Sequence, residues 1–586
     1  MSALGSSTPA EPSMPLERPF PVPSALKLDA NECGPSLVST MIGGGIDLSR
    51  YPDRTELESV LAARAGVDAD RIVATAGADD AIDRTFGLVL EPGSTVVVTE
   101  PSFPMFERFA TERGATVRRV PWTSGPLPVA DLVEAAEGAA AIVIATPNNP
   151  TGAVASAGAI AALRATAPDP ILVLDLAYAE FDALETDGVA EPSLASWCRW
   201  MPRTMLLRTL SKAWGLASLR VGWIETDAET ASAIRDRGGP YPISGFSLRI
   251  ATEALRDPEA DEAMRDRVER VSGLRRRLVR ELEGMGIETE PSRANFVLAR
   301  PGVDGSTADR LRTGLRGLGV AVRGFDRPVM ADRLRITVPT EASALEELVV
   351  AMRTVRRPDG ILLDLDGVIA DVSDSYRTAI LRTAVSFGTI IDSADIEAIK
   401  AAGDANDDWT VTARLLRAAG VEADFDEVVR RFQRLYLGTD DQPGLRERER
   451  SLMRTSSLLE ALAGVPVGVV TGRPRSEAEW FLGRCGLDRR VDVLVAREDA
   501  PLKPDPRGIE RAMDRLGIRT AWFLGDTEDD VLAARRVSGR RVLPIGVIPP
   551  GSIDPDGLRD RLLDAGAGWV VRAGLECVEL LEEARS

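Results

Sequence analysis

At 586 residues the chain is long enough for about four domains of roughly 150 residues each, and its 44% apolar content is that of an ordinary globular protein. Its net charge of −19 argues against nucleic acids and anionic membrane surfaces as general partners. The four cysteines form no CxxC pair, no apolar run could cross a bilayer, and the N-terminus has no signal-peptide pattern. We therefore expect a cytoplasmic protein without a disulfide framework, a zinc site or a membrane span.

The first half of the chain has the pattern of an α/β fold. Residues 1–24 are rich in serine and proline without an apolar period, which predicts a disordered segment. From there to about residue 230, short apolar runs alternate with longer amphipathic segments, which predicts βαβ units and a doubly wound sheet. The runs are RIVATAG, STVVVTEP, AAAIVIATP, PILVLDLA, TMLLRTLS and RVGWIET. Polar or glycine-rich stretches follow most of them, where open α/β sheets bind ligands.

A second strand series follows a short join. A helical stretch over about residues 248–286 leads into a smaller α/β segment that ends near residue 356, and Pro358 and Gly360 mark the break. GILLDLDG then begins a series that continues with VPVGVV, VDVLVA, AWFLGD and RVLPIGV, and a mostly helical insertion occupies about residues 373–455. No internal repeat is visible, so we predict two different domains, residues 25–356 and 357–586.

Lysine is scarce, with four residues among 71 basic ones, and histidine is absent. Lys212 lies in RTLSKAWGLASLR, directly after an apolar run. An aldehyde cofactor that acts as an electron sink needs a lysine for its imine, an acid for its ring nitrogen and anion binders for its phosphate. Asp175 at the end of LVLD supplies the acid, with Tyr178 three residues on. Helix N-termini, hydroxyls and guanidinium groups bind phosphate, and the candidates are Gly77, Ala78, Asp79, Thr209, Ser211 and Arg220.

Six motifs in order carry a family resemblance. They are KLDANE (27–32), RYPD (50–53), TPNNPTG (146–152), RTLSKAWGLASLRVG (208–222), ANF (294–296) and RLRITV (333–338). Over about residues 25–355 the sequence resembles fold-type I pyridoxal-phosphate aminotransferases, and most closely the histidinol-phosphate aminotransferase group. The resemblance implies a large doubly wound domain, a small α/β domain and a homodimer.

The resemblance also implies a role for individual residues. Lys212 would be the imine-forming base and Asp175 the partner of the ring nitrogen, while Asn149 and Tyr178 would bond the ring hydroxyl. Phe103 would stack on the ring, and Tyr51 would reach the cofactor of the neighbouring subunit. Arg335 and Arg323 would bind the substrate. Glutamate and 2-oxoglutarate are the expected amino donor and acceptor.

Three positions depart from the family pattern. The N-terminal loop runs Asn31, Glu32, Cys33, Gly34, Pro35, without the aromatic residue that would lie near the substrate. Leu176 stands at a usually acidic place, and Asp79 and Asp80 follow Gly77 and Ala78 where Ser-Asp-Glu is usual. These changes leave the cofactor chemistry in place and leave open which group the substrate carries.

The second half holds a pair of aspartates after an apolar strand. In DLDGVIAD, Asp364 and Asp366 are two residues apart in an extended segment, so both can point into one cavity. One can attack phosphorus while the other passes a proton to the leaving oxygen. Asp526 and Asp530 in GDTEDD offer hard oxygen ligands for Mg²⁺, and Thr471 and Lys503, each after its own strand, could bind phosphoryl oxygens.

With all four motifs in order over about residues 359–586, this half resembles haloacid dehalogenase superfamily phosphatases, which have a Rossmann-like core. The insertion resembles a helical cap that closes over small substrates. The resemblance makes Asp364 the nucleophile, Asp366 the acid/base, and Thr471 and Lys503 the phosphate binders. Asp364, Asp366, Asp526 and Asp530 would form the metal site.

Together the halves predict a bifunctional enzyme: transamination of imidazole acetol phosphate with glutamate, followed by hydrolysis of histidinol phosphate. The missing histidine fits an enzyme that is needed when histidine is scarce, although a biased genome explains it as well. Three alternatives stay open. They are the same two reactions on another phosphorylated ketone of specialised metabolism, a lyase related to phosphothreonine decarboxylation, and a non-catalytic cofactor-binding regulator.

Overall fold

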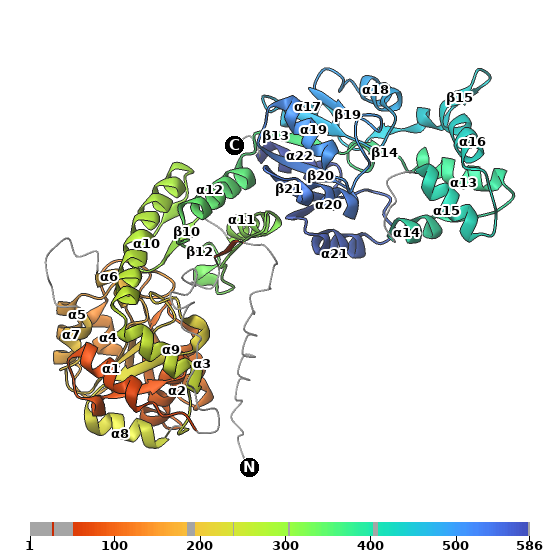
Figure 1. Ribbon diagram of the computed structural model, residues 1–586. Coiled ribbons are helices and arrows are strands. Elements are labelled where there is room, and N and C mark those ends of the chain that lie inside the picture. Colours follow the sequence, from red (N-terminus) through yellow and green to blue (C-terminus); the bar gives the residue numbers. More distant parts are fainter. Residues whose placement is uncertain are drawn as a thin grey trace, which may run out of the picture. The chain divides into compact units, whose positions relative to one another are not determined.

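The computed structural model describes residues 26–28, 51–183, 194–237, 239–302, 305–401 and 408–583. The chain forms two compact units, one of residues 1–308 and 322–346, the other of residues 309–321 and 347–586 (Figure 1). The predicted disordered segment 1–24 and the loop around Cys33 lie outside the described residues. No helix of the described part is long and apolar enough to cross a membrane.

The first unit is built on a seven-stranded sheet. Its strands are β2 (Ile72–Thr75), β3 (Thr95–Glu100), β4 (Thr116–Pro121), β5 (Ala141–Ala145), β6 (Ile171–Asp175), β7 (Thr204–Thr209) and β8 (Gly222–Glu225). They lie in the order β2-β8-β7-β6-β5-β3-β4, parallel from β7 to β4, with β8 antiparallel to both neighbours. All six predicted runs are strands of this sheet. The edge strand β4 was not predicted, because its TVRRVP sequence is mostly exposed and lacks an apolar run.

Helices bury both faces of this sheet. They are α1 (Thr55–Ala65), α2 (Gly77–Val89), α3 (Pro104–Glu112), α4 (Val129–Ala135), α5 (Ala157–Thr166), α6 (Ala179–Ala183), α7 (Leu194–Cys198), α8 (Ala228–Arg237) and α9 (Gly245–Arg256). Successive strand residues point to opposite faces, so Ile142 of β5 lies in one apolar core and Val143 in the other. Burial on both faces explains why these parallel strands are continuous apolar runs.

The predicted helical stretch at 248–286 is two helices. Asp257 ends α9, and its side chain accepts from the backbone N–H of Glu259 to cap α10 (Pro258–Gly284), with Pro258 in the first turn. The antiparallel sheet that follows has the order β12-β10-β9, from β9 (Glu288–Thr289), β10 (Phe296–Arg300) and β12 (Leu334–Thr337). The other strands and α-helices up to residue 356 are β1 (Leu26–Leu28), α11 (Gly305–Gly317), β11 (Val320–Val322) and α12 (Ala342–Arg356), and most of α11 and of α12 belongs to the second unit.

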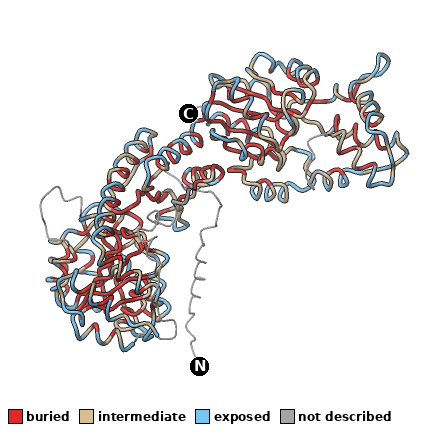
Figure 2. Tube along the Cα trace, viewed as in Figure 1, coloured by how far each residue is buried: buried red, intermediate tan, exposed pale blue. Residues whose placement is uncertain are grey.

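The second unit contains a six-stranded parallel sheet of order β19-β18-β13-β20-β21-β22. The strands are β13 (Gly360–Leu363), β18 (Val467–Val470), β19 (Val493–Val495), β20 (Thr520–Gly525), β21 (Arg541–Ile548) and β22 (Trp569–Arg572). Its helices are α17 (Thr455–Ala461), α18 (Arg475–Arg484), α19 (Arg507–Leu516), α20 (Glu528–Arg536), α21 (Pro555–Ala565) and α22 (Leu575–Glu583). The buried residues gather in the strands of each sheet (Figure 2). The half-exposed edge strand β22 is the one that the sequence did not predict.

A helical insertion follows the first strand of this sheet. It holds α13 (Tyr376–Ser386), α14 (Ser393–Ala401), α15 (Asp408–Ala418) and α16 (Phe425–Leu437), which share an apolar core (Figure 1). The chain leaves through β14 (Ala370–Asp371) and returns through β17 (Arg450–Ser451), which pair antiparallel and which, with Glu449, we call the cap stem. The short elements β15 (Gly438–Thr439), β16 (Gln442–Pro443) and η4 (Leu445–Arg448) precede the return. The insertion thus has the helical character that the sequence predicted.

Candidate active sites

A cavity of about 190 Å³ opens among the loops that follow β3, β5, β6 and β7. Parallel strands end at the same sheet edge, so residues far apart in sequence meet there. Two of the lining residues, Ala145 and Ala177, were not predicted for this site. The others were: Ala78, Asp79, Phe103, Asn149, Asp175, Tyr178, Thr209, Ser211, Lys212, Arg220 and Arg335.

Lys212 and Asp175 lie in this cavity. The Lys212 ammonium nitrogen is 5.6 Å from the centre of the Tyr178 ring, and within the described residues no hydrogen bond or ion pair engages it. Asp175 is the last residue of β6, and its Oδ1 accepts from the backbone N–H of Ala177 at 3.0 Å. Burial raises the pKa of Asp175 to about 6, against the effects of that N–H and of Lys212. A cationic ring nitrogen beside this carboxylate would relieve the cost of its burial.

The N-terminus of α2 forms an anion cradle with the loop around Lys212. A Cβ added to Gly222 would come within 2.7 Å of the Gly77 carbonyl carbon, so the loop packs directly on the first turn of α2. Arg220 has a left-handed backbone (φ +52°), uncommon for a residue other than glycine, and its guanidinium pairs with Asp79 at 3.0 Å. Backbone N–H groups, a guanidinium and the hydroxyls of Thr209 and Ser211 fit the phosphate of pyridoxal phosphate. Gly77 is in this first turn but does not line the cavity.

Arg335 closes another side of the cavity. It lies on β12, is mostly buried, and donates from Nη1 to Oδ1 of Asn149 at 2.6 Å. Arg323, its predicted companion, is hydrogen-bonded to Arg335 through both backbones, but it is not among the lining residues. The structure thus brings Arg335 to the site and leaves the predicted role of the Arg323 side chain as a proposal.

Tyr51 is 78% exposed and stacks on Tyr241 with ring centres 4.4 Å apart. It does not line the cavity of its own subunit. Its predicted contact with the cofactor of a second subunit therefore remains a proposal.

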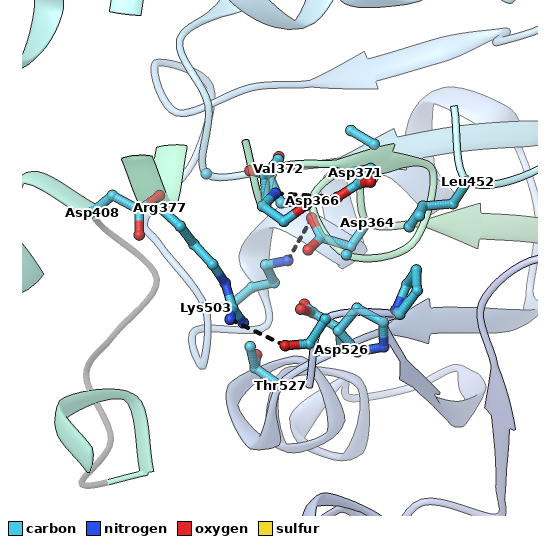
Figure 3. Close-up of a pocket in the computed structure, with 17 residues that line it drawn as sticks. Asp364, Asp366, Asp371, Val372, Arg377, Asp408, Leu452, Lys503, Asp526 and Thr527 are labelled. Carbon is cyan, nitrogen blue, oxygen red and sulfur yellow. Dashed lines mark hydrogen bonds and ion pairs between the residues drawn. The ribbon is translucent and has the colours of Figure 1, made fainter. Parts of the chain in front are cut away.

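A second cavity, of about 70 Å³, lies after β13 and β20 in the second unit (Figure 3). Asp364, Asp366, Lys503 and Asp526, all predicted for this site, line it together with Gly472, which follows the predicted Thr471. The other lining residues come from the loop after β13, the cap stem and the residues next to it, the cap, and the loops after β20 and β21: Gly367, Ala370, Asp371, Val372, Ser373, Arg377, Asp408, Leu452, Thr527, Pro549, Pro550 and Gly551.

Three carboxylates are close enough to share a metal ion. One oxygen from each of Asp364, Asp526 and Asp530 lies within 4.8 Å of the other two. Gly367 has φ +73°, and a Cβ there would meet Asp526 at 2.2 Å, so the glycine of the DLDG motif allows this approach. Asp530 is held by a capping box with Thr527 at the start of α20. Three hard oxygen donors fit Mg²⁺.

Lys503 pairs with two of these carboxylates, Asp364 at 2.9 Å and Asp530. In Figure 3 its side chain points toward Asp364. Burial raises the pKa of Asp364 to about 7, because the lowering effect of Lys503 is offset by the neighbouring charges of Asp530 and Asp366. The two carboxylates raise the pKa of Lys503. A buried ammonium group beside the predicted nucleophile can stabilise phosphoryl oxygens.

Asp366 is not in the carboxylate group, although the sequence placed it there. Its Oδ1 accepts from Nε of Arg473 at 2.7 Å, and its side chain lines the cavity. Thr471 is buried, does not line the cavity, and accepts from the backbone N–H of Arg473 at 3.1 Å. Arg473 was not predicted for this site, although it is a charged residue directly after Thr-Gly at the end of a strand, a signal that could have indicated it.

Comparison with known proteins finds a family match for each half of the chain. Residues 21–352 match the family described as aminotransferase class I and II, and residues 358–538 match the haloacid dehalogenase-like hydrolases. Since the first match covers more than half of the chain, the protein belongs to the aminotransferase class I and II family. Residues 358–538 form a haloacid dehalogenase-like hydrolase domain.

Several relatives are more specific. The histidinol-phosphate aminotransferase of Roseobacter denitrificans is 32% identical over 321 residues, which is 53% of this chain and 87% of that protein. The imidazoleglycerol-phosphate dehydratase of Phytophthora nicotianae is 37% identical over 230 residues, 37% of this chain, and the match spans only half (50%) of that protein. The solved histidinol-phosphate aminotransferase of Sinorhizobium meliloti, in complex with pyridoxal-5'-phosphate, is 25% identical with a TM-score of 0.50. That match covers 56% of this chain and 90% of the other.

The fold, the sites and these relatives define an enzyme with two activities. The first half is an aminotransferase that uses pyridoxal phosphate, and the second is a phosphatase of the haloacid dehalogenase type that uses Mg²⁺.

Proposed function

We propose that the first half transfers an amino group from glutamate to imidazole acetol phosphate and that the second half hydrolyses the resulting histidinol phosphate to histidinol. The observation that carries this proposal is that one chain holds the cavity of Lys212, Asp175 and Arg335 and also an acidic cavity around Asp364 and Lys503. The relatives named histidinol-phosphate aminotransferase support the choice of substrate. The product of the first site is then the phosphate monoester that the second site consumes.

Three side chains have separate roles in the proposed transamination. When bound, pyridoxal phosphate supplies the electron sink that lets the carbon beside the substrate nitrogen lose its proton. Lys212 moves that proton, because its amine lies in the cavity beside Tyr178. Asp175 is the residue that would keep the ring nitrogen cationic. Arg335 binds the anionic end of each substrate in turn, because a guanidinium fork fits both a carboxylate and a phosphate.

Hydrolysis uses the two aspartates of the DLDG motif. Asp364 attacks phosphorus and the bond to the substrate oxygen breaks, while Asp366 gives that oxygen a proton. Water then attacks the same phosphorus, Asp366 takes its proton, and the bond to Asp364 breaks to release inorganic phosphate. Lys503 offsets the repulsion between carboxylates and phosphoryl oxygens. Asp364, Asp526 and Asp530 are the residues that would hold Mg²⁺, which neutralises charge at this site.

A homodimer is part of the proposal. Tyr51 and Tyr241 form an exposed aromatic pair, which supports a surface that a second subunit covers. Tyr51 would then reach the neighbouring cofactor.

The proposal is tested with purified protein, pyridoxal phosphate and Mg²⁺. Histidinol phosphate is supplied with and without 2-oxoglutarate, and glutamate and free phosphate are followed separately. We expect glutamate only with 2-oxoglutarate and phosphate in both cases, while Lys212→Ala loses the glutamate and keeps the phosphate. If neither product forms although absorbance shows the cofactor bound at Lys212, the substrate assignment is wrong.

A further inference from the structure

The side chain of Arg473 is 1% exposed although it carries a charge. It follows β18 in the TGRP sequence, next to the phosphatase cavity. A buried guanidinium group destabilises a fold unless its N–H groups are paired with acids or other acceptors. The groups that pair with the Arg473 guanidinium therefore indicate the role of this buried charge.

The first partner is the predicted acid/base. Nε of Arg473 donates to Oδ1 of Asp366 at 2.7 Å, and Nη2 donates to the same oxygen. No side chain or backbone group of the described residues bonds Oδ2. Asp366 lines the cavity and its side chain is 33% exposed. Two N–H groups on Oδ1 keep negative charge on that oxygen, so Oδ2 is the oxygen left to carry and deliver a proton.

The second partner belongs to the cap stem. Nη1 of Arg473 donates to Oε2 of Glu449 at 2.9 Å and to the hydroxyl of Tyr436 at 3.2 Å. The Glu449 side chain is completely buried, and its Oε1 accepts from Ser375 at 2.8 Å and from Tyr436 at 3.0 Å. Glu449 thus has three donors, all of which would lose their acceptor if it moved.

Aromatic rings confine the guanidinium group further. Its central carbon lies 4.8 Å from the centre of the Tyr376 ring and 5.5 Å from that of Phe481. Tyr376 begins α13 in the cap, whereas Phe481 lies on α18 beside the sheet. Arg473 is therefore held by the core of the unit and by its cap at the same time.

We propose that Arg473 is a positioning residue that holds Oδ1 of Asp366 so that Oδ2 meets the leaving oxygen, and that Glu449 of the cap stem holds Arg473 in that pose. This inference rests on the proposed role of Asp366 as the acid. It ties proton delivery to the position of the cap, since Glu449 lies where the cap chain returns to the sheet.

A misplaced acid has a kinetic signature. A proton donor matters greatly for an alkyl phosphate, whose alcohol is a poor leaving group, and little for 4-nitrophenyl phosphate, whose phenolate leaves unaided. The test measures kcat/KM of the full-length enzyme with Mg²⁺ for 4-nitrophenyl phosphate, phenyl phosphate and glycerol phosphate. For Arg473→Lys and Glu449→Gln we expect a loss below about 3-fold on the first substrate that grows to about 100-fold on the last. Asp366→Asn should show the same trend, and Arg475→Lys, two residues on and paired with Asp499 instead, should show no loss.

The outcomes separate this inference from the function on which it rests. Suppose that Asp366→Asn loses more kcat/KM on glycerol phosphate than on 4-nitrophenyl phosphate. If Arg473→Lys and Glu449→Gln then lose kcat/KM equally on all three substrates, the arginine only maintains the fold. If Asp366→Asn itself loses activity equally on all substrates, Asp366 is not the acid and both proposals are wrong. Glu449→Gln changes no volume, so it answers the question even if Arg473→Lys does not fold.

Discussion

The Asp175→Asn substitution is expected to stabilise the cofactor-free protein while it disables transamination. Burial raises the pKa of Asp175 from its usual 3.8 to about 6. Since one pKa unit corresponds to about 1.4 kcal/mol, an ionised Asp175 costs the cofactor-free fold roughly 3 kcal/mol. The folded pKa lies above the unfolded one, so the folded state binds the proton more tightly. The cofactor-free wild type therefore loses stability as pH rises from about 4 to 6, and the asparagine variant escapes this loss.

Thermal unfolding of the cofactor-free proteins measures the effect. At about 2 °C per kcal/mol, the variant should melt roughly 6 °C higher than the wild type at pH 8, and about half as much higher at pH 5. Asparagine can still accept from the N–H of Ala177, so the local hydrogen bond gives no opposing effect. With pyridoxal phosphate bound, the gain should vanish and glutamate formation should fall by about 100-fold or more. A variant that melts below the wild type at pH 8 would refute the reasoning.

Three other predictions concern the separate sites. Asp364→Asn should abolish phosphate release and leave glutamate formation within about 2-fold of the wild type, because the nucleophile and Lys212 belong to different cavities; retained phosphate release would contradict the assignment. Chelation of divalent cations should likewise stop phosphate release alone, and added Mg²⁺ should restore it in a phosphate assay. Arg335→Lys should raise the KM for glutamate by about 10-fold or more in steady-state kinetics, because lysine cannot form two parallel bonds to a carboxylate. An unchanged KM would remove Arg335 from substrate binding.

Asp175 and Lys212 were predicted correctly as neighbours, whereas Thr471, which also follows a predicted strand, does not line its cavity. Asp175 ends β6 and Lys212 follows β7, and the structure lines one cavity with both. The reason is geometric: parallel strands that form one sheet bring their carboxyl ends to one edge, whatever the number of residues between them. The same rule places Asp364 and Lys503 together after their own strands.

Glu449 could not be predicted in this way. It lies in RERERS (446–451), an alternation of charges that is typical of a solvated segment, yet its side chain is fully buried. Only the return of the cap chain beside β14 brings it to Arg473, and that contact depends on packing and not on a local pattern. The edge strands β4 and β22 were missed for a related reason: β4 is mostly exposed and has no apolar run, and the apolar run of β22 is only three residues long.

The most direct test of the account is a progress curve with imidazole acetol phosphate, Mg²⁺ and the cofactor-loaded enzyme, with and without glutamate. The measured species are 2-oxoglutarate, histidinol phosphate and inorganic phosphate. We expect phosphate release to require glutamate and to lag behind 2-oxoglutarate, and we expect Asp364→Asn to accumulate histidinol phosphate. Phosphate release from the ketone at the same rate without glutamate would contradict the claim that the two sites act in sequence.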